Sequence, residues 1–143
     1  VRAAKLLGWS NVSTRATAQQ LLSVADAARL SHAGAYTEQA YGLVRSKHPH
    51  TSAAAQAAFS LGRVEVRQGR LSQAARWFER YVHERPKGSL VEQARGRALA
   101  CRAKLPNDNA ACSTARAYLR EHPKGPRANL ALKERRRCAT ATP

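Results

Sequence analysis

The sequence predicts an all-α fold: a right-handed α-solenoid of three helical hairpins followed by a C-terminal capping helix. Residues 55–86 contain two amphipathic segments, in which apolar residues recur at three and four positions as on one face of a helix. Gly69 separates these segments, and Pro49, Pro86 and Pro123 recur at intervals of 37 residues. Because one hairpin cannot bury its own apolar face, repeated hairpins must stack on their neighbours.

The central hairpin shows how each unit is built. Its first helix carries Ala58, Leu61, Gly62 and Val64, and its second carries Leu71, Ala74, Ala75, Phe78 and Val82. We expect Gly69 to adopt the left-handed conformation that ends the first helix, and Pro86 to end the second. The small residues Gly62 and Ala74 are expected to let the two backbones approach closely.

The other elements are expected in the same pattern along the chain. The expected divisions are a lead-in or linker at residues 1–13, hairpins at about 14–49, 52–86 and 89–123, a capping helix at 126–138, and a frayed tail at 139–143. The expected N-cap residues are Ser13 or Thr14, Ser89 and Asp108. A shift of 37 residues also superposes Tyr81 on Tyr118 and Lys87-Gly88 on Lys124-Gly125.

The net charge of +16 comes from 25 basic and 9 acidic residues, and arginine supplies 19 of the basic ones. One interpretation is an acidic partner such as nucleic acid, anionic lipid or an acidic protein face. The other is that a GC-rich genome encodes arginine wherever a solvated charge is needed, since the arginines are spread through every expected helix. No stretch is apolar enough to span a membrane. The chain begins at Val1 and contains no methionine, so we expect an excised domain or a processed fragment, and the compartment stays open.

No set of residues indicates catalysis, a metal or a cofactor. The acidic residues are expected on polar helix faces, three or four positions from a basic residue, as Glu79 is from Arg76 and His83. The pair His48 and His50 flanks a proline and has no third ligand at a suitable spacing. We therefore expect a protein that is not an enzyme.

The central hairpin resembles a tetratricopeptide repeat, whose pattern places a Leu-Gly pair, a turn glycine, a small residue, an aromatic and a final proline over roughly 34 residues. The matching positions are Leu61-Gly62, Gly69, Ala74, Phe78 and Pro86, whereas Ala58 and Glu65 replace the usual Trp and Tyr. The period of 37 residues and the junctions ERPKGSLVEQA and EHPKGPRANLA are similar to those of bacterial cell-envelope members. Examples are the cell-division coordinator family and the lipoprotein of the β-barrel assembly machinery. The phrase AAFSLGRVEVRQGRLSQAARWFERYV also resembles the C-terminal repeat region of FecR-like anti-sigma regulators.

This resemblance implies a protein–protein interaction scaffold within a larger envelope or regulatory protein. The first helix of each hairpin would line a concave surface, and the positions implied to be exposed there are Gln56, Phe59, Arg63, Arg67, Gln93, Arg97 and Lys104. A basic groove of this kind would bind an acidic peptide or protein. The alternative is a helical repeat that binds nucleic acid, although the chain lacks interleaved aromatic residues for base stacking. If the arginines are merely solvated, they bind neither.

The three cysteines allow a disulfide between Cys101 and Cys112. These residues lie on either side of the expected turn at residues 106–107, so antiparallel helices would hold them at nearly equal height. Cys138 would then remain an unpaired thiol. A disulfide would indicate the periplasm or cell envelope, whereas three reduced cysteines would fit the cytoplasm.

Overall fold

All regular structure in the computed structural model, which describes residues 17–32, 34–106 and 109–141, is helical. The helices in these ranges are α3 (Ala18–Leu30), α4 (Ala35–Lys47), α5 (Ser52–Arg67), α6 (Leu71–Glu84), α7 (Val91–Ala103), α8 (Ala110–Glu121) and α9 (Ala128–Ala141). The prediction of an all-α chain is therefore confirmed for the described residues. The last helix extends beyond its expected end at Cys138, and the expected lead-in at residues 1–13 lies outside the described ranges.

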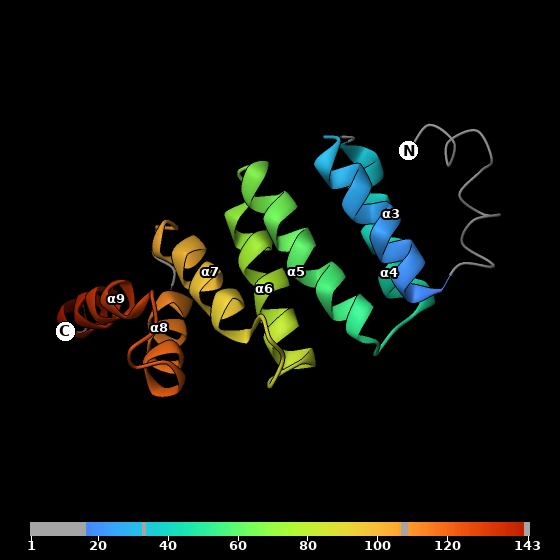
Figure 1. Cartoon of the computed structure of the whole chain (residues 1–143). Coiled ribbons are helices and arrows are strands. Elements are labelled where there is room, and N and C mark those ends of the chain that lie inside the picture. The colour runs from blue at the N-terminus through green and yellow to red at the C-terminus, as the bar shows by residue number, and fades with distance from the viewer. Residues whose placement is uncertain (1–16, 33, 107–108, 142–143) are drawn as a thin grey trace.

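The helices follow one another in chain order from α3 to α9, as Figure 1 shows. Every helix packs against the next one along the chain, and contacts between alternate helices join α3 to α5 and α7 to α9. Short connections between antiparallel helices account for the first kind of contact. Among the described residues, the more extensive contacts between helices therefore join helices that are one or two places apart in chain order.

The hydrophobic core is accordingly divided into successive layers rather than gathered at one centre. The largest buried side chains of the first layer are Leu21, Leu22, Tyr41 and Leu61; of the second, Phe59, Phe78 and Tyr81; and of the third, Leu99 and Tyr118. Helix α5 contributes to the first layer through Leu61 and to the second through Phe59. It is therefore covered on both sides, which explains why Ala53, Ala54 and Ala55 are all buried.

Gly69 ends α5 as the sequence predicts. Its φ angle is 76°, in the left-handed region that glycine occupies at little cost. The N–H of Gly69 donates to the carbonyl of Val66, and the N–H of Arg70 donates to the carbonyl of Glu65. These two bonds form a Schellman motif, which satisfies carbonyls that the helix end would otherwise leave unpaired.

Gly62 lies directly beneath the Phe78 ring. A Cβ atom at this position would be 2.7–2.9 Å from three ring carbons of Phe78. The ring itself is fully buried and packs edge-to-face against Phe59, with the ring centroids 5.3 Å apart. The close approach expected at Gly62 is therefore present, and its cause is an aromatic ring rather than a backbone.

The repeated Lys-Gly junction has a structural cause as well. The hydroxyl of Tyr81 accepts a hydrogen bond from the N–H of Leu90, at 3.2 Å, and the hydroxyl of Tyr118 accepts one from the N–H of Arg127, at 2.9 Å. A side chain at Gly88 or Gly125 would collide with the corresponding hydroxyl. The tyrosine and the glycine therefore recur together because they form one contact.

The predicted helix caps are mostly wrong. The N-cap of α3 is Thr17, which forms a capping box with Gln20, while Ser13, Thr14 and Asp108 lie outside the described residues. Helix α7 begins after Leu90 without a side-chain cap, so Ser89 does not have its expected role. The N–H of Leu90 is bonded to Tyr81 instead, and the long-range contact fixes the start of this helix.

The disulfide joins Cys112 of α8 to Cys138 of α9, whose Cα atoms are 6.0 Å apart, and Cys101 is a free, buried thiol. The predicted pairing of Cys101 with Cys112 is therefore wrong, as is the expectation that Cys138 stays unpaired. Cys101 belongs to the core layer formed with α5 and α6, so it lies on the face of α7 that is turned away from α8. A disulfide between two helices requires cysteines at similar heights along the helices. It also requires that the two side chains point toward each other, and Cys101 does not meet this second requirement.

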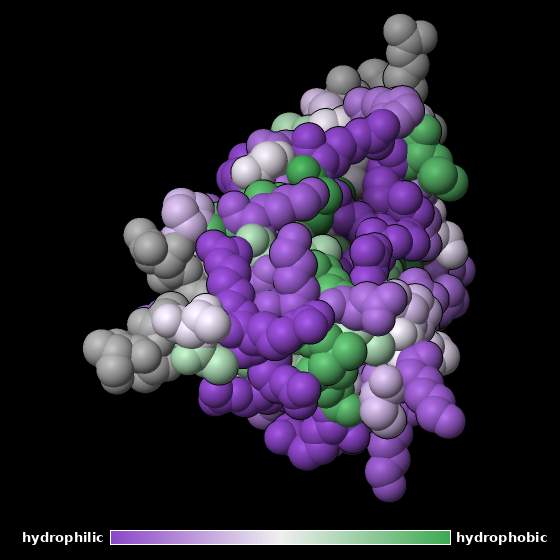
Figure 2. Space-filling model, turned by 90° about the vertical axis from the view of Figure 1, so that its left-hand side faces the viewer, coloured by the Kyte–Doolittle hydropathy of each residue, from purple (hydrophilic) through white to green (hydrophobic). Residues whose placement is uncertain are grey.

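The surface at the α9 end is mostly hydrophilic, with smaller hydrophobic areas between the polar ones (Figure 2). The basic residues Lys133, Arg135, Arg136 and Arg137 of α9 are all exposed.

Candidate functional site

The predicted groove residues lie on α5 and α7, except Lys104, which is the C-cap residue of α7. Four of them are exposed: Gln56, Arg67, Gln93 and Lys104. Arg63 and Arg97 are half-buried. The remaining residue, Phe59, is only 2% exposed, so its prediction as an exposed contact is wrong.

Phe59 is buried because it completes an aromatic cluster between α5 and α6. Its ring packs edge-to-face against Phe78 and Tyr81, with centroid separations of 5.3 and 5.9 Å. Such edge-to-face pairs place the positive rim of one ring against the negative face of another. The position that the repeat pattern assigns to a partner contact is therefore used for the core of this protein.

Two arginines cover the Phe59 ring. The guanidinium carbon of Arg63 lies 5.1 Å from the ring centroid, and that of Arg97 lies 5.6 Å from it. Arg63 follows Phe59 by four residues on α5 and so lies on the same helix face, whereas Arg97 reaches across from α7. Both distances fall within the range of cation–π attraction, so the Phe59 ring attracts two guanidinium groups at once.

A third arginine, Arg29 of α3, joins this group, although sequence reasoning missed it. Burial lowers the pKa of Arg63, and the positive charges of Arg97 and Arg29 lower it further. The Nε–H of Arg29 donates to the Tyr41 hydroxyl at 3.1 Å, and that hydroxyl donates to Asp26 at 2.5 Å. The spacing of these arginines could have identified Arg29. Arg29, Arg63 and Arg97 recur at intervals of 34 residues, which is the usual tetratricopeptide period.

Three of the described carboxylates are engaged elsewhere, in ion pairs with an arginine from another part of the helical array. These pairs are Arg45–Glu84 at 2.8 Å, Arg70–Glu38 at 2.7 Å and Arg102–Glu79 at 2.5 Å. The expected local pairing of Glu79 with Arg76 and His83 is therefore wrong. Arg102, whose side chain is only 13% exposed, reaches Glu79 from the next hairpin instead.

The groove is consequently a region in which positive charge is only partly compensated. Among the described residues, Arg63, Arg67 and Arg97 form no ion pair with a carboxylate. Asp26 offsets part of the charge at Arg63, but its carboxylate is already bonded to Tyr41. We call Arg29, Arg63, Arg67 and Arg97 the arginine groove. It presents guanidinium donors that a carboxylate or phosphate could accept from.

Within the described residues, no group of three or more histidine, cysteine or acidic side chains is arranged to hold a metal ion. No helix in the same part of the chain has the length and apolar character needed to cross a membrane.

No protein-family model matches the chain, and comparisons with curated proteins and with solved structures found no match.

Proposed function

We propose that this chain is a tetratricopeptide-type solenoid domain that binds an acidic peptide or protein segment through the arginine groove and catalyses no reaction. It would serve as a scaffold within a larger bacterial envelope or regulatory protein. The consecutive hairpins, the contact between Gly62 and Phe78, and the left-handed Gly69 support the repeat assignment. Contacts between alternate helices support stacking of hairpins into a solenoid.

One observation carries the proposed binding function. Arg63 and Arg97 converge on a single ring with Arg29 nearby, although burial and, after it, repulsion by Arg97 and Arg29 lower the pKa of Arg63. Gathering like charges without a counter-charge costs stability, and an anionic ligand would recover that cost on binding. The same repulsion would have been avoided if these arginines served only as solvated surface.

The disulfide between Cys112 and Cys138 supports a location in an oxidising compartment such as the periplasm, because reducing compartments rarely retain such bonds. The cytoplasm is the alternative location.

The test compares two triple variants that lose the same charge. The groove variant replaces Arg63, Arg67 and Arg97 with serine. The control replaces the exposed residues Arg76, Arg116 and Arg136 of α6, α8 and α9 with serine. Affinity for a short fluorescent Glu-rich peptide is measured by anisotropy, and circular dichroism verifies that both variants remain helical.

We expect the groove variant to lose at least tenfold in affinity, which corresponds to about 1.4 kcal/mol, while the control loses much less. Equal losses would show that only net charge matters, and this would refute the groove. A single-stranded oligonucleotide serves as the competing ligand. Tighter binding to it than to the peptide, with a steep fall of log affinity against log salt, would favour the nucleic-acid alternative.

A further inference from the structure

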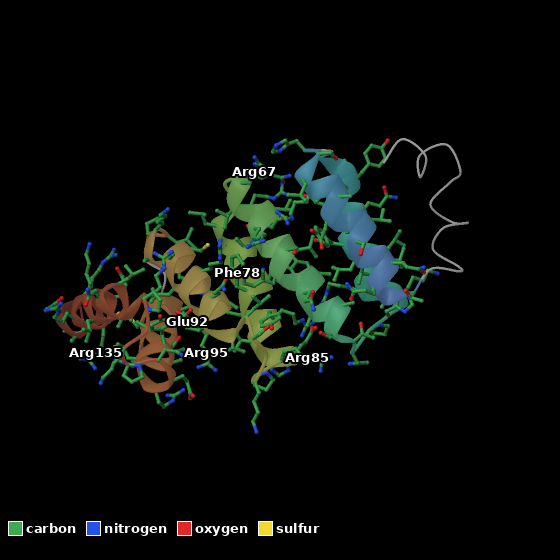
Figure 3. All side chains as sticks on the ribbon, viewed as in Figure 1. Arg67, Phe78, Arg85, Glu92, Arg95 and Arg135 are labelled. Carbon is green, nitrogen blue, oxygen red and sulfur yellow. A yellow bond between two sulfur atoms is a disulfide. The ribbon has the colours of Figure 1, made fainter. Side chains whose placement is uncertain are left out.

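A cavity of about 220 Å³ lies at the end of the arginine groove, between the C-terminal parts of α3 and α5 (Figure 3 labels Arg67 at this end). Its polar lining includes Arg29 and His32 on one side and Arg63, Arg67 and Gln68 on the other. Arg97 is not part of this lining. The cavity therefore forms a separate subsite at one end of a longer basic surface.

Three arginines from two helices contribute to the lining of this cavity. Among the described residues, the hydrogen-bond partner of Arg29 is Tyr41, which engages Nε alone. Arg63 and Arg67 form no ion pair with any described carboxylate. Asp26 offsets part of the positive charge at Arg63, and its carboxylate is bonded to the Tyr41 hydroxyl. Among the described residues, the lining of the cavity contains three arginines and no carboxylate.

The number and arrangement of these donors distinguish between possible anions. A carboxylate carries one negative charge and is satisfied by one bidentate arginine. A phosphoryl group carries a charge of about −1.5 to −2 at neutral pH and three strong acceptor oxygens, so it can accept from several arginines at once. Three arginines converging from two directions, with a histidine and an amide beside them, fit the second kind of ligand better.

We infer that this cavity binds the phosphoryl group of a phosphorylated side chain, so that the groove recognises an acidic segment carrying one phosphorylated residue. This inference rests on the proposed peptide-binding function and specifies its ligand. The phosphoryl group would dock against Arg29, Arg63 and Arg67, while the rest of the peptide would extend past Arg97.

The experiment uses three versions of one acidic peptide that differ at a single position, which holds phosphoserine, glutamate or serine. Affinities are measured by fluorescence anisotropy for the wild-type chain and for three single variants. Arg67→Gln changes the cavity at an exposed residue, so it leaves the core untouched, whereas Arg97→Gln changes the groove outside the cavity. Arg136→Gln, on the exposed face of α9, controls for net charge.

We expect the phosphoserine peptide to bind about tenfold more tightly than the glutamate peptide, the effect of one additional charge-assisted hydrogen bond. Arg67→Gln should bring this ratio close to one. Arg97→Gln should weaken both peptides while preserving the ratio, and Arg136→Gln should change neither. These outcomes together would support a phosphoryl subsite.

Equal wild-type affinities for the phosphoserine and glutamate peptides, with both weakened by Arg97→Gln, would overturn the inference and leave the proposed function standing. If none of the peptides binds, the proposed function fails as well. Inorganic phosphate provides the last arm, as a competitor of the phosphoserine peptide. Competition at concentrations similar to those of the peptide would show that the subsite takes the free anion, and would overturn the assignment to a phosphorylated side chain.

Discussion

Replacing Gly62 with alanine tests the packing on which the central hairpin depends. The new methyl carbon would lie 2.7–2.9 Å from three carbons of the Phe78 ring, much closer than carbon atoms approach in folded proteins. Phe78 cannot easily move away, because it is fully buried and packs against Phe59. The substitution therefore forces a shift in the hairpin.

Two opposing effects determine the size of the change. Overpacking of a well-filled core costs about 1–3 kcal/mol. Alanine gains about 1 kcal/mol over glycine in a helix interior. The packing cost should prevail, since the obstacle is a buried ring rather than a flexible chain end. Because the ring cannot yield, the packing cost should lie in the upper part of its range, at about 2–3 kcal/mol, which leaves a net destabilisation of about 1–2 kcal/mol.

The matched control is Gly42→Ala in α4, where a Cβ would have no neighbouring atom within 4 Å. This variant gains helix propensity without a clash, so it should be more stable by about 0.5–1 kcal/mol. Urea unfolding followed by far-UV circular dichroism gives both values. The reasoning would be refuted if Gly62→Ala proved as stable as the wild type while Gly42→Ala behaved as expected. Gly62→Ala combined with Phe78→Leu should recover part of the loss.

Two further predictions concern the disulfide and the pH dependence of stability. Thiol counting on denatured, non-reduced protein should find one free thiol, from Cys101, and three free thiols would contradict the pairing. Replacing both Cys112 and Cys138 with serine should destabilise the fold by about 3 kcal/mol. The hydrogen bonds and charge of Arg45 lower the pKa of Glu84, so this carboxylate stabilises the fold above its unfolded pKa, and that contribution is lost as the pH falls through the folded pKa. Urea midpoints measured between about pH 5 and pH 3 should therefore fall less steeply for Arg45→Gln than for the wild type, and identical slopes would exclude the pair as a cause.

The helices and their order could be predicted because the information is local. Apolar residues spaced three and four apart identify the buried face of each helix, and Gly69 and Pro86 limit the helices through their own backbone preferences. The repeat could be recognised for the same reason, because each hairpin repeats a similar pattern of apolar, glycine and proline residues. The tyrosine–glycine contact at Tyr118 and Gly125 shows that even an unexplained repeat marked a real interaction.

Two of the features that sequence reasoning missed, at Phe59 and at Cys101, depend on direction around a helix axis. Phe59 was placed on the exposed face of α5, but it faces the aromatic cluster with Phe78. Cys101 faces α6 rather than α8, and this leaves Cys112 to pair with Cys138. A change of one position rotates a side chain by about 100° around a helix, so small errors in register exchange the inside for the outside.

The arginine groove illustrates how two periods coexist in one chain. The structural repeat has a period of 37 residues, which places Arg97 in register with Ser60, whereas Arg63 lies three residues further along α5. Three residues are nearly one helical turn, so Arg63 and Arg97 share a similar direction but differ in height by about 4.5 Å. Both guanidinium groups lie over the Phe59 ring, at 5.1 and 5.6 Å from its centroid. Arg29, Arg63 and Arg97 recur every 34 residues, whereas the hairpins repeat every 37 residues. The line through these three arginines is therefore oblique to the axes of α3, α5 and α7. A bound acidic segment that contacted them all would have to cross α3, α5 and α7 at an angle, rather than follow any one of them.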